Sequence, residues 1–484
     1  MKQESGGILK GLKWSLLDQF GIYALKLIFG IAIARLLTPN DYGIVGVTAI
    51  FIAIGRQLTD SGFQMALIQK KDADEKDYNT VFVFNLVASS IVYLILYFSA
   101  RPIADIYDRP ELVNIIRIFS LNIPIGALSG VQLVLMMKNL DFKTQAQINF
   151  SSTVMSGLLG LVLAMNGFGF WALVIQTLSG TVARSFMFWY KAHWIPSLSF
   201  SISSFKSLFR FGSKILGQGL IDNFFTNIYN PLIGKYYSIN ELGFYSKAKS
   251  FTDLYTVQIS VAVTRVAFPA FSNINTDKNA LRENYKFAIN VLTVFFFGAT
   301  LFLFPLMKPA VILFLTKKWA HLVPFMQLLI LEAFFFPLYR LNMVFLEAQG
   351  KSGTTFMIDL SKKAMMLVAL IFTIDKGVEA IIYGYLFSSG ISFFITWFFL
   401  TDFLKLKDQF SLFSINALLG FAVFLFTKTT GHLLPLGSIW LPFVNSLITL
   451  ALFFILIRFP LSEPYRLARD FVFKIRTSSQ KIKQ

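Results

Sequence analysis

Long apolar stretches limit most strongly what this chain can fold into. Runs of about 20 apolar residues, the length that crosses a bilayer core as a helix, recur from Leu9 to Phe459 with short breaks between them. Lipid offers no partner to an unpaired backbone group, so such segments must be helices or a closed barrel. The runs over 291–306 and 439–457 are continuous, whereas barrel strands alternate polar and apolar residues. The sequence therefore predicts an all-α polytopic membrane protein.

The apolar runs divide into about fourteen predicted transmembrane helices of the usual spanning length. A further segment, 308–323, carries three lysines and a tryptophan and is expected to lie at the membrane interface. The predicted spans are residues 9–36, 41–67, 79–101, 111–136, 144–165, 168–191, 206–235, 240–268, 283–307, 324–348, 354–375, 378–401, 410–428 and 437–458.

Composition narrows the possible functions. Charged residues make up 14% of the 484 residues, against about a quarter in soluble proteins, so little of the chain is expected outside the bilayer. The sequence has no cysteine and only three histidines, far apart, so we expect no metal site and no cofactor. The net charge of +18 could suggest nucleic acid, but no soluble domain is predicted to bind it.

Basic residues predict how the chain lies in the membrane, because Lys and Arg collect in cytoplasmic loops. With the N-terminus placed in the cytoplasm, most lysines and arginines near the span ends fall on that side. An even number of spans then places both termini in the cytoplasm. The basic tail over 461–484 either anchors the last span or lies on an anionic leaflet.

A repeated turn organises the chain. Residues 34–43 (Ala-Arg-Leu-Leu-Thr-Pro-Asn-Asp-Tyr-Gly) resemble residues 234–243 (Gly-Lys-Tyr-Tyr-Ser-Ile-Asn-Glu-Leu-Gly). Thr38 with Asp41, and Ser238 with Glu241, have the spacing of a capping box, and Pro39 suits the first position of a helix. Any helix–turn–helix favours such caps, but the match across the whole segment indicates a duplication with parallel repeats.

These residues also resemble a known family. Arg35-Leu-Leu-Thr-Pro-Asn-Asp-Tyr-Gly43 is similar to the turn after the first helix of Wzx-type polysaccharide flippases, members of the multidrug/oligosaccharidyl-lipid/polysaccharide exporter superfamily. The similarity covers most of the chain and is greatest to the colanic-acid and teichuronic-acid exporters. Further matching motifs follow in order at 58–63 (Leu-Thr-Asp-Ser-Gly-Phe), 66–71, 79–82, 140–143, 211–212, 233–235, 242–245, 268–272 (Phe-Pro-Ala-Phe-Ser) and 349–351.

The resemblance implies a fold and a function. It implies two MATE-like six-helix lobes around a central cavity, here 1–200 and 201–403, followed by two additional helices over 404–460. It implies export of undecaprenyl-pyrophosphate-linked oligosaccharide across the cell inner membrane by alternating access, in lipopolysaccharide, capsule or exopolysaccharide synthesis. A polysaccharide polymerase and a chain-length regulator are the expected partners. Such a protein is a transporter and not an enzyme.

Ionisable residues inside the spans are the candidate site. Each costs about 2.5–3.5 kcal/mol at the centre of a spanning helix, so it is expected to face a cavity or a partner. The acids could bind H⁺ or Na⁺ and couple transport to an ion gradient, whereas the bases and amides could bind phosphate and sugar. The substrate-cavity candidates are Lys26, Arg56, Lys214, Gln218, Lys247, Lys249 and Arg340, and the ion-coupling candidates are Asp18, Asp222 and Asp253.

Other charged residues allow simpler explanations. Asp60 and Arg184 lie within two or three turns of a predicted cytoplasmic end, where snorkelling or topology explains them equally well.

Lys214, Gln218 and Asp222 follow one another at four-residue spacing and so form a polar stripe on one helix face. The alternative to a cavity is a set of buried structural ion pairs.

Two other functions fit parts of the sequence. A drug or metabolite antiporter of the same superfamily would share the two lobes, but commonly has twelve spans and a less cationic cavity. A membrane glycosyltransferase or polymerase would need acids or a metal held on a sizeable loop, and the longest predicted outer loop has only about 16 residues.

Overall fold

The computed structural model describes residues 21–60, 62–274, 278–401, 446–448 and 451. The chain divides into two compact units, Met1–Ser246 and Lys247–Gln484. Asp18, the basic tail and nearly all of the two predicted C-terminal spans lie outside the described residues. The lobe boundary expected near residue 200 stays a prediction.

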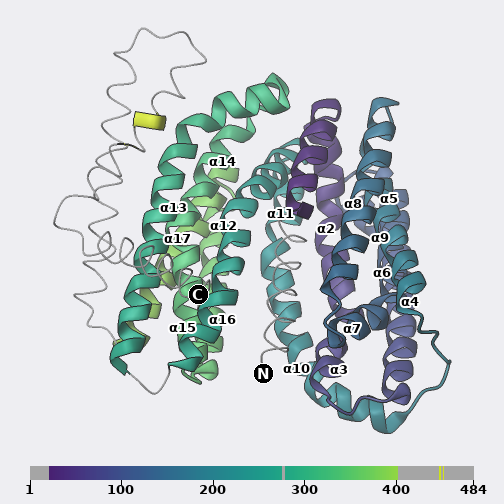
Figure 1. Ribbon diagram of the computed structural model, residues 1–484. Coiled ribbons are helices and arrows are strands. Elements are labelled where there is room, and N and C mark those ends of the chain that lie inside the picture. The colour runs from purple at the N-terminus through teal and green to yellow at the C-terminus, as the bar shows by residue number, and fades with distance from the viewer. Residues whose placement is uncertain (1–20, 61, 275–277, 402–445, 449–450, 452–484) are drawn as a thin grey trace, which may run out of the picture. The chain divides into compact units, whose positions relative to one another are not determined.

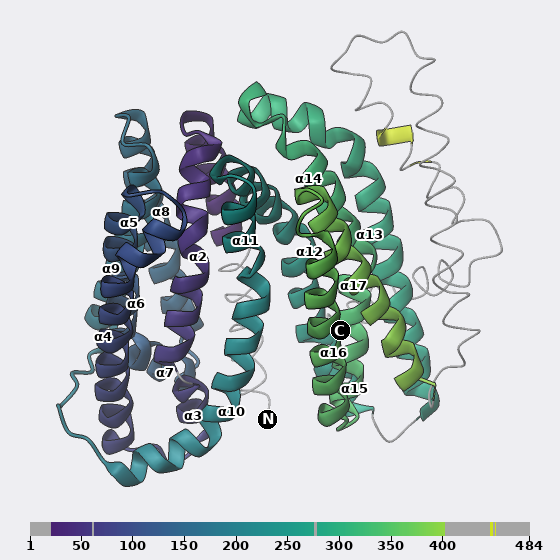
Figure 2. The ribbon, with the colours of Figure 1, turned by 180° about the vertical axis from the view of Figure 1, so that it is seen from behind.

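The first unit is a bundle of helices that run roughly alongside one another (Figure 1). A helix over 21–36 comes first, and α8 and α9 form a tightly packed pair. Viewed from behind, α10 lies beside α2 (Figure 2). The other elements are α2 (Pro39–Asp60), α3 (Phe63–Gln69), α4 (Glu75–Ile106), α5 (Glu111–Phe119), α6 (Asn122–Ala127), α7 (Gly130–Lys138), α8 (Phe142–Met165), α9 (Phe170–Ala192), α10 (Ile202–Asn227) and α11 (Tyr229–Tyr236).

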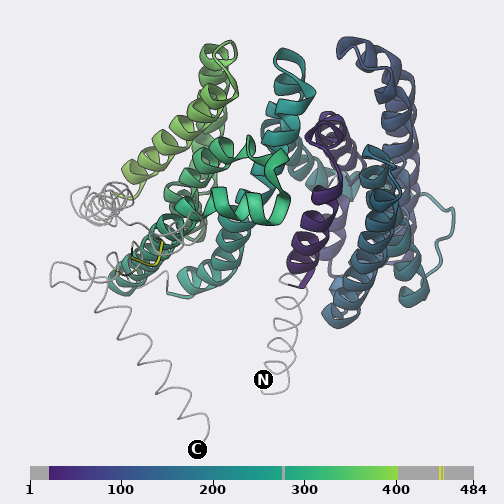
Figure 3. The same ribbon diagram turned by 90° about the horizontal axis from the view of Figure 1, so that it is seen from above.

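The second unit packs around an aromatic core. Tyr285, Phe345 and Phe393 are fully buried there, and the Tyr285 and Phe345 rings meet edge to face at 4.8 Å. Figure 3 views these green helices from above. The elements are α12 (Ile239–Asn273), which begins in the first unit, α13 (Lys278–Leu315), a 3₁₀ turn (Lys317–Trp319), α14 (Leu322–Ile330), a second 3₁₀ turn (Leu331–Phe334), α15 (Phe336–Ala348), α16 (Ser352–Thr373) and α17 (Val378–Phe399).

The described helices make this an all-α membrane protein with several spans. Within the described part of the chain, 8 helices or helix groups are long and apolar enough to cross a bilayer. Every predicted span from 41–67 to 378–401 coincides with a helix or a run of short helices. Those over 168–191, 206–235 and 354–375 are not among the 8, because they carry more polar residues or, over 354–375, the three charges of Asp359, Lys362 and Lys363. The total of fourteen stays a prediction.

Several predicted spans are interrupted. The span predicted at 41–67 breaks between α2 and α3 at Gly62, whose φ of +72° favours glycine. The span predicted at 111–136 consists of three short helices. By contrast, α13 continues through Pro305 and Pro309 to Leu315, so the first half of the expected interfacial segment is helical. An apolar pattern predicts that a segment enters the membrane, but not where its helix breaks.

The two predicted turns have the expected caps. Thr38 N–H donates to Asp41 Oδ2 over 2.8 Å, and Asp41 N–H donates to Thr38 Oγ1 over 3.3 Å. In the second turn, Glu241 N–H donates to Ser238 Oγ over 3.1 Å. The helices that follow begin at Pro39 and Ile239. The predicted capping box is therefore confirmed at the first turn, and its hydroxyl half is confirmed at the second.

These two turns also contact each other. A Cβ added to Gly43 would overlap with the Ile239 carbonyl oxygen, and a Cβ added to Gly243 would overlap with the Pro39 carbonyl oxygen. The four residues form two pairs offset by 200 positions in the sequence, so the contact is reciprocal, as an approximate two-fold axis requires. Glycine at both positions lets the two helices touch backbone to backbone. This symmetry supports the duplication.

Candidate functional site

A polar cavity lies inside the first unit. Its volume is about 430 Å³, within the range of small-molecule sites. We call it the N-unit cavity. The cavity is lined by Ala53, Arg56, Gln57, Thr59 and Asp60 of α2, Gln64 of α3, Asn85 of α4, Asn122, Ile123, Gly126 and Ala127 of α6, Thr181 and Arg184 of α9, and Asn223 of α10.

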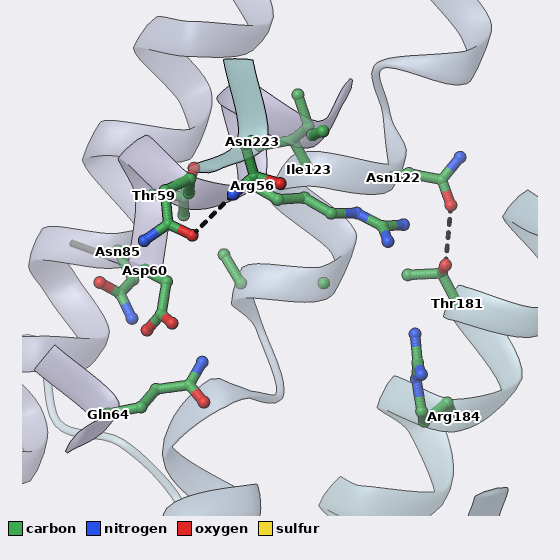
Figure 4. A pocket seen from close by; sticks show the side chains of 14 residues that line it. Arg56, Thr59, Asp60, Gln64, Asn85, Asn122, Ile123, Thr181, Arg184 and Asn223 are labelled. Carbon is green, nitrogen blue, oxygen red and sulfur yellow. Dashed lines mark hydrogen bonds between the residues drawn. The ribbon is translucent and has the colours of Figure 1, made fainter. Parts of the chain in front are cut away.

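Two arginines enter the N-unit cavity from different helices (Figure 4). Arg56 comes from α2 and Arg184 from α9. Among the described residues, neither guanidinium has an acidic partner within ion-pair distance. Arg184 also acts electrostatically on both Arg56 and Lys26. Three cations thus share one neighbourhood, and this arrangement suits an anionic ligand.

Amides and hydroxyls fill the rest of the wall. Thr181 Oγ1 donates to Asn122 Oδ1 over 2.7 Å, and Asn223 Nδ2 donates to Gln57 Oε1 over 3.1 Å (Figure 4). These bonds join α6 to α9 and α2 to α10. They hold neutral hydrogen-bonding groups around the arginines, and such groups can bind sugar hydroxyls.

The stripe on α10 has the predicted register. Lys214, Gln218 and Asp222 all lie within α10, and Lys214 and Gln218 are exposed within the structure while Asp222 is half-buried. None of the three lines the N-unit cavity, so their role as a cavity wall stays a prediction.

The remaining predicted residues lie in the second unit and have close neighbours. Lys249 Nζ is 3.0 Å from Asp253 Oδ1, and Arg340 Nη1 is 3.9 Å from Glu347 Oε1. The Lys247 ammonium lies 5.0 Å from the centre of the Phe251 ring. These contacts are those of a packed bundle, and a role in substrate or ion binding stays a prediction for all four predicted residues.

Most of the cavity lining was not among the sequence candidates. Among the residues predicted to bind substrate or ion, only Arg56 lines the cavity. Asp60 and Arg184 could be explained by their position near a helix end, and no pattern in the sequence singled out the amides of the lining. The available signal was an asparagine within an apolar run, as at Asn85 and Asn122. Buried amides need partners, so they mark polar surroundings almost as well as charges do.

Comparisons with known proteins place the chain in a family. A family model described as polysaccharide biosynthesis protein matches residues 32–324, more than half of the chain. The chain belongs to this family. Its Wzx-type members are transporters, so the family resemblance and the expectation that the chain is not an enzyme are confirmed.

Curated relatives agree with that assignment. The chain is 25% identical to the teichuronic acid biosynthesis protein TuaB of Bacillus subtilis, over 88% of this chain and 90% of that protein. It is 26% identical to the succinoglycan biosynthesis transport protein ExoT of Rhizobium meliloti, over 67% and 66%. The lipopolysaccharide biosynthesis protein WzxC of Escherichia coli is also 26% identical, over 66% of each chain. This family member is a multi-pass membrane transporter of polysaccharide biosynthesis.

Solved structures show which fold the transporter adopts. The lipid II flippase MurJ, in an inward closed conformation, aligns with a TM-score of 0.73 over 92% of this chain and 98% of that one, at 15% identity. An inward-facing multidrug resistance MATE transporter aligns with a TM-score of 0.60 over 78% and 93%, at 16% identity. The MATE-like fold expected from the resemblance is confirmed.

Proposed function

We propose that this transporter flips undecaprenyl-pyrophosphate-linked oligosaccharide from the cytoplasmic to the periplasmic leaflet by alternating access. The observation that carries the proposal is the pair Arg56 and Arg184, which enter one cavity without an ion-pair partner among the described residues. They do so in a member of a polysaccharide biosynthesis transport family. The relatives are named for surface glycans, and MurJ is named a lipid II flippase.

The cavity chemistry fits each part of that substrate. A pyrophosphate favours planar guanidinium donors, which can bind two oxygens at once. Sugar hydroxyls favour amides and hydroxyls, such as Asn122, Thr181 and Asn223. The polyprenyl tail can stay in the hydrocarbon phase, where it has no desolvation cost.

The finer organisation is part of the same proposal. Fourteen spans would place both termini in the cytoplasm and the chain in the inner membrane. The lobes would be 1–200 and 201–403, with the last two helices appended. Lys26, Lys214, Gln218, Lys247, Lys249 and Arg340 would also bind the substrate, and Asp18, Asp222 or Asp253 would bind H⁺ or Na⁺. A polymerase and a chain-length regulator would receive the product.

A cation-coupled drug or metabolite antiporter is the second candidate, because MATE transporters share the fold. The cavity favours the flippase. A drug site of this superfamily is expected to be less cationic, whereas two arginines and only one acid line this cavity.

Deletion of the chromosomal copy tests the proposal against this alternative. We expect lipid-linked glycan to accumulate on the cytoplasmic leaflet, where an added membrane-impermeant glycosidase cannot reach it, and the wild-type chain to restore its export. Unchanged surface glycan together with altered drug tolerance would favour the antiporter.

A further inference from the structure

The candidate span Pro39–Gln69 is broken beside the N-unit cavity. Asp60 is the last residue of α2, and α3 begins at Phe63, yet both helices belong to one candidate span, Pro39–Gln69. The last carbonyls of a helix lack intrahelical partners, and its C-terminus carries partial negative charge. In transporters, such half-helix ends inside the membrane can coordinate cations.

Two oxygens at this break are buried without a partner. Asp60 Oδ1 and Asn85 Oδ1 are both inaccessible to solvent, and neither has a hydrogen-bond partner. Asn85 is only 2% exposed, and both side chains line the N-unit cavity (Figure 4). An unsatisfied buried acceptor costs about 1–3 kcal/mol, and more when it is charged, so a ligand that brings positive charge would relieve both.

The neighbouring charges leave the carboxylate available. Arg56 is one helical turn before Asp60, a spacing at which ion pairs are common, but no ion pair joins them among the described residues. Arg184 of α9 is the other charged side chain in the lining, and α3, α4, α6 and α10 contribute no charged side chain to it. The Gln64 backbone N–H faces the carboxylate, on the side of α3.

We propose that the N-unit cavity binds one monovalent cation, Na⁺ or a proton, at Asp60, with Asn85 as the second oxygen ligand. A single carboxylate suits one positive charge, whereas divalent ions collect several carboxylates. The cation neutralises the one acid in the lining and leaves the two arginines unopposed. By linkage, cation binding therefore strengthens the binding of an anion in the same cavity.

The test uses the purified full-length chain in lipid nanodiscs and needs no glycan, so its outcome is separate from that of the proposed function. The first readout is the thermal midpoint as NaCl replaces choline chloride at constant ionic strength. The second is the infrared C=O stretch of a protonated carboxyl group, compared between mildly acidic and mildly alkaline buffer. The variants are Asp60→Asn, Asn85→Ala and, as a matched acid control, Asp105→Asn, which removes an exposed carboxylate that pairs with Arg101 and does not line the N-unit cavity.

We expect either a saturable rise in the midpoint with Na⁺ or a carboxyl band that vanishes at alkaline pH. Asp60→Asn lowers that signal, Asn85→Ala weakens Na⁺ affinity by about tenfold, and the Asp105→Asn control keeps the full signal. Asp60→Glu, which retains the carboxylate, keeps a weaker signal and guards against misfolding of the amide variant. The proposal is overturned if the wild type gives neither signal, or if Asp60→Asn retains the wild-type signal.

Discussion

The two units handle charge inside the membrane in different ways. In the first unit, Arg56 and Arg184 enter a cavity of about 430 Å³ with no ion pair among the described residues. In the second unit, Glu332 is 3% exposed and accepts a hydrogen bond from Tyr385 OH, while Lys363 Nζ lies 2.5 Å from Asp359 Oδ2. A charge must be hydrated or paired to be tolerated in lipid. The first unit holds these two arginines in a cavity, whereas the second packs Glu332 and Lys363 against partners.

The difference indicates a division of roles between the units. A paired charge contributes to one conformation of a bundle, and its removal leaves an uncompensated partner. A charge in a cavity contributes little to packing and is available to a ligand. We therefore expect substitutions of charge to change the stability of the second unit and the transport activity of the first.

The largest stability effect is expected at Glu332. Glu332→Ala removes the acceptor of Tyr385 and an opposite charge that acts on Lys249 and Lys362. Loss of one partner of a buried charged network typically costs about 3–5 kcal/mol, so the thermal midpoint and the membrane abundance should both fall. Normal membrane abundance with lost transport would show that Glu332 acts on a ligand. The two units would then not differ in the role of their charged residues.

The next effect is steric and should be equal in the two repeats. An alanine at Gly43 or at Gly243 places a methyl group on the other turn's backbone carbonyl, and such overpacking costs about 1–3 kcal/mol. Thermal unfolding of the two single variants should give similar losses, because the contacts are reciprocal. A loss of stability in only one of the two variants would argue against the two-fold relation between the turns. It would not affect the difference in charge pairing between the units.

A smaller effect is expected within the cavity wall. Thr181→Val removes the donor to Asn122 Oδ1, a buried bond of 2.7 Å. The free energy of unfolding should fall by about 1 kcal/mol, as measured by chemical denaturation in detergent. Thr177→Val, which removes only a hydroxyl bonded to the Leu173 carbonyl on the exposed side of α9, serves as the control. Equal losses in the two variants would show that the Asn122 bond contributes nothing of its own.

The smallest effect is expected at the Lys249–Asp253 pair. Its side chains are 19% and 32% exposed, one helical turn apart, and pairs of this kind contribute about 0.3–0.5 kcal/mol. A double-mutant cycle of Lys249→Met and Asp253→Asn should give a coupling of that size. If Asp253 instead couples transport to an ion, export will fall without a matching loss of stability, and the second unit will also hold a ligand site.

The sequence predicted the helices well because burial in lipid imposes a strong and local pattern. Each apolar run between 41 and 401 became a helix or a run of helices, and Thr38 and Asp41 capped their helix as expected. The break at Gly62 depends on a close contact with the Gly212 backbone, which no local pattern encodes.

The site was only partly predictable for a related reason. Arg56 stood out because a charge at mid-span has few explanations. Arg184 joins it through the packing of α2 against α9, and its position near a helix end gave it an alternative role. Asn85 and Asn122 are uncharged, so they attract attention only once their helices are seen to share a cavity.

The most direct measurement is the flipping rate in proteoliposomes, with undecaprenyl-pyrophosphate-linked glycans extracted from cells that lack the transporter. Arg56→Ala and Arg184→Ala should each lower the rate by about tenfold or more, the value of one charge-assisted hydrogen bond, with unchanged thermal midpoints. Arg101→Ala, which removes an exposed arginine paired with Asp105, should flip at the wild-type rate. Wild-type rates in both cavity variants would contradict the assignment of the N-unit cavity as the substrate site.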